Sequence, residues 1–147
     1  MRIIGLSCKS FKETFKMETV VDNEFVTVWV YPDKKIVRHK FHKFIFGEPF
    51  RQALTKGADA FEKYHCVKWL SDDSENSALL PEDSEWGQIY WEPRIMRAGW
   101  KHWALILPEK VVGQMNMNRL VKRYSEQGVN VKIFSNPTEA LSWLEHQ

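Results

Sequence analysis

The apolar residues of this chain change their spacing near Gly47, and that change limits the folds open to it. Before Gly47, the segment Phe25–Tyr31 alternates valines with aromatic residues and threonine, which is the two-residue period of a strand with one buried face. After Gly47, apolar residues recur at three- and four-residue intervals, as on the buried side of a helix. The sequence therefore predicts a protein that combines a sheet with helices.

Strand-type and helix-type segments alternate along the rest of the chain. Phe25–Tyr31 and Lys35–Phe41 form a predicted antiparallel hairpin, preceded by a weaker strand at Met17–Val21. The later predicted elements are a helix ending near Tyr64, the strand Cys66–Leu70, a helix from Pro81 that kinks at Pro93, the strand His102–Leu107, the helix Glu109–Gln127, the strand Val129–Phe134 and a helix from Pro137 through Leu144. Because strand–helix–strand crossovers join parallel strands, we expect an α/β fold with a mixed sheet.

The length of the chain fits one domain. It has 147 residues without a linker or an internal repeat, so we expect a single domain over residues 1–147, with residues 1–15 as a peripheral segment. No apolar run reaches the ~20 residues of a membrane span, and the N-terminus lacks a signal-peptide stretch, so we expect a cytoplasmic protein that does not insert into membranes. Two cysteines, Cys8 and Cys66, agree with a reducing compartment.

A series of short motifs covers most of the chain beyond about Val20. In chain order these are Lys35-Ile-Val-Arg-His-Lys-Phe41, Phe50-Arg-Gln-Ala-Leu54, Lys68-Trp-Leu-Ser-Asp72, Pro81–Trp86 continuing to Trp91-Glu-Pro93 and Ala98-Gly99, the strand His102–Pro108, and the ending Phe134–Leu144 of the form F-x-N-x-x-E-A-x-x-W-L. Their order and spacing resemble those of SpoIIAA-like and STAS-like (STAS/SEC14-type) small α/β domains.

The resemblance implies a SpoIIAA/STAS-like sheet with helices mainly on one face and no enzymatic activity. It also implies a regulatory domain that binds protein partners, since domains of this kind do so and some bind nucleotides or lipids. In anti-sigma-factor antagonists of this type, phosphorylation of a loop serine switches partner binding. The corresponding loop here lacks the glycine of that motif, and phosphorylation of its serines stays open: Ser71, Ser74, Ser77 and Ser84.

Sequence motifs for catalysis and for metal binding are missing or incomplete. The chain has no Gly-x-Ser-x-Gly, HExxH, GxGxxG or P-loop pattern, so we predict no catalytic residue, no cofactor and no enzyme activity. His39 and His42 are three positions apart in a predicted strand, which directs them to opposite faces. Asp72, Ser74, Asn76 and Asp83 match part of a calcium-binding loop, but Ser77 replaces its glycine, and we favour a solvated loop without a metal.

The aromatic residues give two candidate binding regions. Phe25, Trp29 and Tyr31 are expected on the sheet face opposite the valines, beside Arg38 and Lys40, and Trp91 is expected to be exposed while Trp86 and Tyr90 face the core. Such a surface fits a protein partner or a second copy of the chain in a homodimer. A platform for single-stranded nucleic acid is the weaker interpretation, since a sequence pI near 8.5 is not strongly basic.

The second region is a predicted pocket. Trp69, the loop that begins at Asp72, and Trp86 lie around the start of the second helix, beyond the carboxyl end of a parallel strand, where open α/β sheets commonly bind ligands. The leading functional hypothesis is thus a non-enzymatic interaction or regulatory module, and the alternative is a small-molecule or lipid-binding module that uses this pocket.

Overall fold

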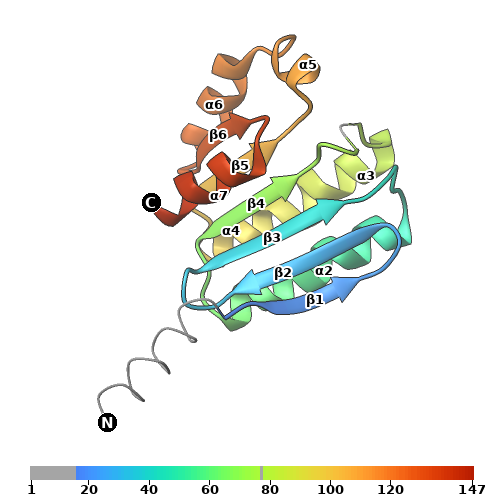
Figure 1. Cartoon of the computed structure of the whole chain (residues 1–147), viewed down its shortest axis with the longest axis vertical. Coiled ribbons are helices and arrows are strands. Elements are labelled where there is room, and N and C mark those ends of the chain that lie inside the picture. The colour runs from blue at the N-terminus through green and yellow to red at the C-terminus, as the bar shows by residue number, and fades with distance from the viewer. Residues whose placement is uncertain (1–15, 77) are drawn as a thin grey trace, which may run out of the picture.

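A six-stranded mixed sheet forms the centre of the protein (Figure 1). The computed structural model describes residues 16–76 and 78–147, so the predicted peripheral segment 1–15 lies outside the described residues. The strands are β1 (Glu18–Asp22), β2 (Val26–Tyr31), β3 (Ile36–Phe41), β4 (Lys68–Asp72), β5 (His102–Ile106) and β6 (Asn130–Phe134). They lie side by side in chain order, antiparallel from β1 to β3 and parallel from β3 to β6, which confirms the α/β class.

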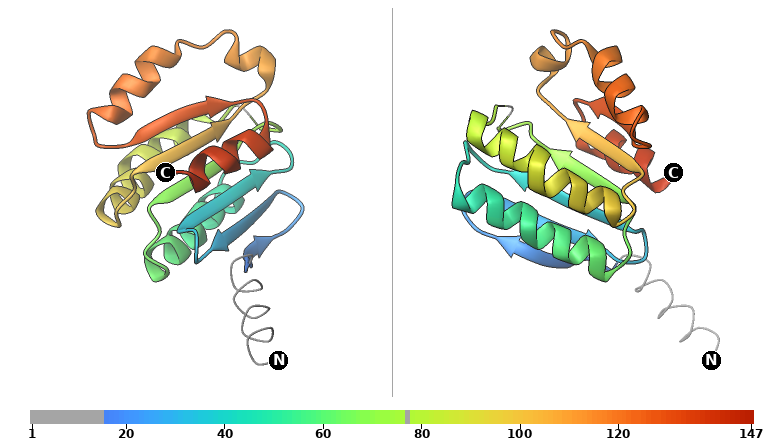
Figure 2. Two further views of the ribbon diagram at one scale, coloured as in Figure 1. Left: turned by 60° about the vertical axis from the view of Figure 1, so that its left-hand side comes forward. Right: turned by 180° about the vertical axis from the view of Figure 1, so that it is seen from behind.

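Helices cover the two faces of the sheet unequally. They are α2 (Glu48–Lys63), α3 (Pro81–Trp86), the π-helix η1 (Gly87–Trp91), α4 (Glu92–Arg97), α5 (Glu109–Val112), α6 (Met117–Ser125) and α7 (Pro137–Glu145). The crossover helices α2 to α6 lie on one face, and α7 packs on the other face against β4, β5 and β6 (Figure 2). Among the described residues, no helix covers the α7 side of β1 and β2. No described helix is long and apolar enough to cross a membrane.

Apolar side chains fill the space on both sides of the sheet. On the side of α2, the valines of β2 are fully buried with Phe61 and Trp69. On the side of α7, a smaller cluster joins Ile36, Leu70 and Leu144. This division follows from strand geometry, because successive side chains of a strand point to opposite faces.

The helix that starts at Pro81 contains a π turn just before Pro93, where the sequence predicted a kink. The backbone N–H of Glu92 bonds to the carbonyl of Gly87, five residues back, just before a proline that has no N–H to donate. One extra residue in a helical turn rotates the following side chains by about 100°. The expected orientations were therefore wrong: Tyr90 is 64% exposed, and Trp91 packs against the core.

The predicted helix Glu109–Gln127 is two helices, α5 and α6. The break lies between Gly113 and Asn116, whose side-chain oxygen accepts a hydrogen bond from the backbone N–H of Arg119 at 3.3 Å. Such a cap starts a new helix because it satisfies one of the free N–H groups of the first turn. Apolar residues on both sides of the break had concealed it in the sequence pattern.

The close approach of α2 to Trp69 gives a test of this packing. In Gly57→Ala, the added Cβ would lie 2.6 Å from Cη2 of the Trp69 ring. We expect the free energy of unfolding to fall by up to about 2 kcal/mol, because overpacking costs about 1–3 kcal/mol and better helix propensity returns about 1 kcal/mol. Urea unfolding measures the change.

Gly87→Ala is the matched control. Nothing lies within 4 Å of a Cβ built at Gly87, so this substitution should raise the free energy of unfolding by up to about 1 kcal/mol. Equal stabilisation by both substitutions would contradict the described contact between Gly57 and Trp69.

Candidate ligand-binding site

A cavity of about 410 Å³ opens at the carboxyl ends of β3, β4 and β5. Its walls come from α2, the β4–α3 loop, α3, η1 and the segment that contains α5 and α6. The apolar residues that line it are Phe41, Phe50, Leu54, Leu79, Trp91, Trp100, Trp103, Leu105, Leu107, Val111, Met115 and Tyr124. The cavity thus lies in the region where the sequence predicted a pocket, beside the start of the helix at Pro81.

Aromatic rings form a continuous series along one side of the cavity. The ring centroids of Trp91 and Trp100 are 5.6 Å apart, and those of Trp100 and Trp103 are 5.4 Å apart. The ring centroids of Trp103 and Tyr124 are 5.0 Å apart, with an angle of 70° between the ring planes. Tilted and edge-to-face pairs at these distances are favourable, so each ring restricts the orientation of the next. The cavity therefore has rigid aromatic walls.

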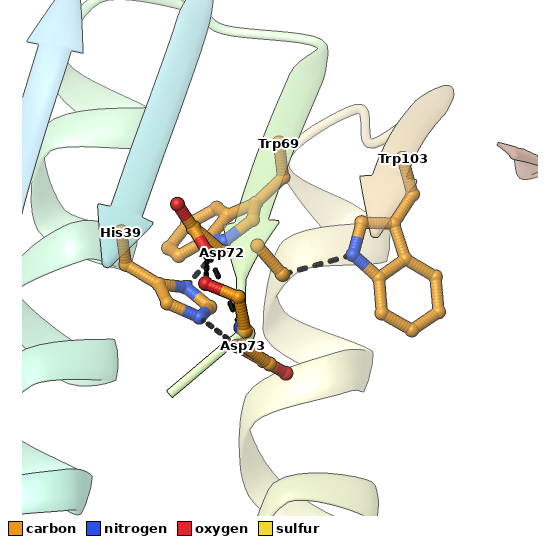
Figure 3. Close-up of polar contacts among 7 residues, drawn as sticks. His39, Trp69, Asp72, Asp73 and Trp103 are labelled. Carbon is orange, nitrogen blue, oxygen red and sulfur yellow. Dashed lines mark hydrogen bonds and ion pairs between the residues drawn. The ribbon is translucent and has the colours of Figure 1, made fainter. Parts of the chain in front are cut away.

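His39 connects the core to the cavity wall through both of its ring nitrogens (Figure 3). The indole N–H of Trp69 donates to His39 Nδ1 at 3.0 Å, and His39 Nε2 lies 2.8 Å from Asp73 Oδ1. Because an indole nitrogen can only donate, Nδ1 must accept, and the ring proton resides on Nε2 and points to Asp73. His39 thus positions the Asp73 carboxylate and has no ring nitrogen left to act as a base.

Two further hydrogen bonds fix polar groups of the wall. Trp103 Nε1 donates to the hydroxyl of Ser71 at 2.9 Å (Figure 3), and the Tyr124 hydroxyl donates to Glu92 Oε1 at 2.5 Å. Burial, followed by the bond to the Glu92 carboxylate, raises the pKa of Tyr124 well above its ordinary value. Tyr124 therefore remains a protonated donor at neutral pH.

Two buried N–H groups in the cavity lining have no hydrogen-bond partner among residues 16–76 and 78–147. They are Nε1 of Trp100 and Nδ2 of Asn76, in residues that are 4% and 6% exposed. An unsatisfied buried donor costs about 1–3 kcal/mol, and native proteins keep few of them. Both donors belong to residues that line the cavity.

Asp83 joins the segments at the edge of the cavity. Its carboxylate accepts from the backbone N–H of Gly47 at 3.0 Å and from Nε of Arg51 at 3.2 Å, and the side chain is almost fully buried. Gly47 has a φ of 65°, a left-handed conformation that glycine adopts without strain. Asp83 thereby ties the β3–α2 loop to the first turn of α3.

The three residues predicted to bind a ligand lie around the cavity and not in its lining. Trp69 is fully buried behind His39. Asp72 is also fully buried; its Oδ1 accepts from the hydroxyl of Ser74 at 2.6 Å, and strand alternation directs it toward the α7 side. Trp86 packs on Phe50 and lines a shallow surface groove. A role for any of the three in ligand contact stays a prediction.

The acidic loop does not gather its carboxylates into one place. Asp72 is bound to Ser74, whereas Asp83 is bound to Gly47 and Arg51. Across residues 16–76 and 78–147, no three His, Cys, Asp or Glu side chains are grouped to hold a metal ion.

The predicted interaction surface is only partly formed. Trp29 and Tyr31 share the sheet face opposite the β2 valines, and the Arg38 guanidinium lies 5.3 Å from the Trp29 ring. Phe25 does not share that face. It lies in a turn before β2, where Asn23 Oδ1 accepts a hydrogen bond from the backbone N–H of Phe25. Its side chain packs against the core on the α2 side. Trp91 lines the cavity. Contact of these residues with a partner stays a prediction.

Several residues of the cavity were missed in the sequence. Glu92, Trp100, Trp103 and Tyr124 were not identified as candidates, and Asn76 was considered only for a calcium-binding loop, although all five line the cavity. One usable signal was the concentration of tryptophan between Trp86 and Trp103, which holds four of the seven tryptophans of the chain. Aromatic clusters of that density commonly line ligand pockets.

Asp83 provides a test of how the edge of the cavity is held. In Asp83→Ala, the N–H of Gly47 and the side chain of Arg51 lose a common partner, and we expect the free energy of unfolding to fall by about 1–3 kcal/mol. Asp59→Ala removes an exposed partner of Arg94 and should cost less than about 1 kcal/mol. Equal losses for the two variants in urea unfolding would show that Asp83 does not have this role.

Comparison with protein-family models, with curated proteins and with solved structures finds no match in any of the three. The resemblance to SpoIIAA-like and STAS-like domains therefore rests on the sequence pattern alone.

Proposed function

We propose that this protein is a non-enzymatic binding module whose cavity takes up a small organic molecule. The observation that carries the proposal is a cavity of about 410 Å³ whose lining residues Trp100 and Asn76 each hold a buried N–H with no partner among the described residues. A bound acceptor would satisfy them and recover the free energy that they cost in the empty cavity.

The size and lining of the cavity support the same proposal. Small-molecule sites usually enclose about 300–1,000 Å³, with mainly apolar and aromatic walls and a few polar groups that set orientation. This cavity has that composition, and it lies at the carboxyl ends of parallel strands, where α/β sheets bind ligands.

The hydrogen bonds of the polar groups in the lining favour a binding role over a catalytic one. Both ring nitrogens of His39 are engaged, by Trp69 and by Asp73, so the imidazole is not free to activate a nucleophile. The hydroxyl of Ser71 is bonded to Trp103 and not to a histidine. Among the described residues that line the cavity, the hydrogen bonds form no nucleophile–base pair.

A variant that fills the cavity tests the proposal. A chemically mixed library of small molecules is screened by thermal unfolding of the whole chain and of Ser84→Trp, which places a large ring in the lining. A ligand at a hundred times its Kd adds about 2.7 kcal/mol, which raises the Tm of a domain of this size by about 5–10 °C. We expect binders for the unmodified chain and none for Ser84→Trp.

The control is Glu85→Trp, which adds the same ring at an exposed position of α3 outside the cavity. Binders should be retained by Glu85→Trp. A library without binders, or binders that Ser84→Trp retains, would overturn the proposed use of this cavity.

A second candidate function is association of two copies through the sheet face that carries Trp29 and Tyr31. The supporting observation is that no described helix covers this side of β1 and β2, so Trp29 and Tyr31 are only half-buried. The charges on this face are mixed, because Arg38 and Lys40 share it with Asp22 and Asp72.

Sedimentation velocity tests this association. We expect a dimer fraction that increases with protein concentration, as mass action requires when two copies associate. Trp29→Ala should sediment as a monomer throughout, while Tyr90→Ala, which removes an exposed aromatic ring elsewhere, should retain the dimer. Identical sedimentation of Trp29→Ala and the unmodified chain would exclude this interface.

A further inference from the structure

The charges in the cavity lining are all of one sign. The lining contains Asp73, Asp83 and Glu92, and the described residues that form it include no Lys or Arg. Asp83 is balanced by Arg51, which reaches it at 3.2 Å from outside the lining. The charge that remains at the cavity comes from the other two carboxylates.

Neither Asp73 nor Glu92 has a cationic partner in the described part of the chain. Asp73 Oδ1 accepts from His39, whose ring is neutral because Nδ1 accepts from Trp69. Glu92 Oε1 accepts from the hydroxyl of Tyr124, which is also neutral. A bound anion would meet uncompensated negative charge from both groups, whereas a cation would be attracted by both.

The aromatic walls favour the same kind of ligand. Trp91, Trp100, Trp103 and Tyr124 line the cavity together with Phe41 and Phe50. Tryptophan is the side chain with the strongest attraction for cations at its ring face, and cages of aromatic rings with a nearby carboxylate hold quaternary ammonium groups. The buried N–H groups of Trp100 and Asn76, which have no partner among the described residues, favour a ligand that also carries a hydrogen-bond acceptor.

We infer that the ligand of this cavity is a small organic cation, a protonated or quaternary amine that also carries a hydrogen-bond acceptor such as a hydroxyl or carbonyl oxygen. The ammonium group lies between the tryptophans and the carboxylates of Asp73 and Glu92, and the acceptor faces Trp100 and Asn76. This inference rests on the proposed function, since it specifies the class of molecule that the cavity takes up.

Three probes of nearly equal shape test the charge preference. They are choline, its uncharged carbon isostere neohexanol, and the tert-butylacetate anion. Each is titrated into the whole chain, and binding in the cavity is followed by the NMR resonance of the Trp100 indole N–H. We expect choline to bind at least about fivefold more tightly than neohexanol, and the anion to bind least.

Glu92→Gln tests whether the preference for choline arises in the cavity. The amide oxygen of the new side chain can still accept from the Tyr124 hydroxyl, but the negative charge is lost. We expect this variant to lose the advantage of choline over neohexanol. Glu85→Gln removes the same charge from an exposed position on α3 and should change neither affinity. Asp73→Asn is the second variant, with the same expectation, should Glu92→Gln fold poorly.

The outcomes separate this inference from the proposed function. If neohexanol binds as well as choline and still shifts the Trp100 resonance, the cavity binds small molecules but is not selective for cations, and the inference is overturned. Tightest binding of the anion overturns it as well. If no probe shifts that resonance up to its solubility limit, the cation inference fails, and the library screen with Ser84→Trp decides separately whether the cavity binds any molecule.

Discussion

The indole of Trp69 lies where the sheet, α2 and η1 meet, and its packing sets the positions of all three. The ring is fully buried, contacts α2 so closely that residue 57 has no room for a Cβ, and meets Trp91 of η1 edge to face with 4.9 Å between ring centroids. Its N–H also orients His39. One side chain therefore takes part both in the core and in the hydrogen bonds that shape the cavity wall. Because interiors are densely packed, the cavity inherits the rigidity of the core.

The π turn has a similar double role. By inserting one residue into the helix that starts at Pro81, it turns Trp91 toward the core, where Nε1 donates to the carbonyl of Leu54 at 3.1 Å, and it places Glu92 within reach of Tyr124. A regular helix would have presented Tyr90 in that direction instead. Single π turns within α-helices are frequent at functional sites, where they aim side chains that the regular period would direct elsewhere. The aromatic series and one carboxylate of the cavity both depend on this local irregularity.

The sequence predicted most of the sheet, because the alternation in Phe25–Tyr31 and the short apolar strands each depend on local spacing. It could also indicate the end of the sheet at which a cavity forms, since that follows from the parallel strand–helix order. The lining could not be predicted in the same way. Ser71 and Leu105 become neighbours only through the register of β4 with β5, and Tyr124 reaches Glu92 across helices far apart in the chain. The predicted orientation of Trp91 was wrong because the prediction assumed the period of a regular α-helix across a segment that contains a π turn.

The order of the strands in the sheet is the order of the chain, so every strand pairs only with those that directly precede and follow it. A chain of this topology can lengthen its sheet one strand at a time as it leaves the ribosome, and no strand has to be inserted between two that are already paired. The segment with Val111, Met115 and Tyr124 closes one side of the cavity and follows β1 to β5 in the chain. The cavity is thus completed only after β1 to β5, which support it, have been made.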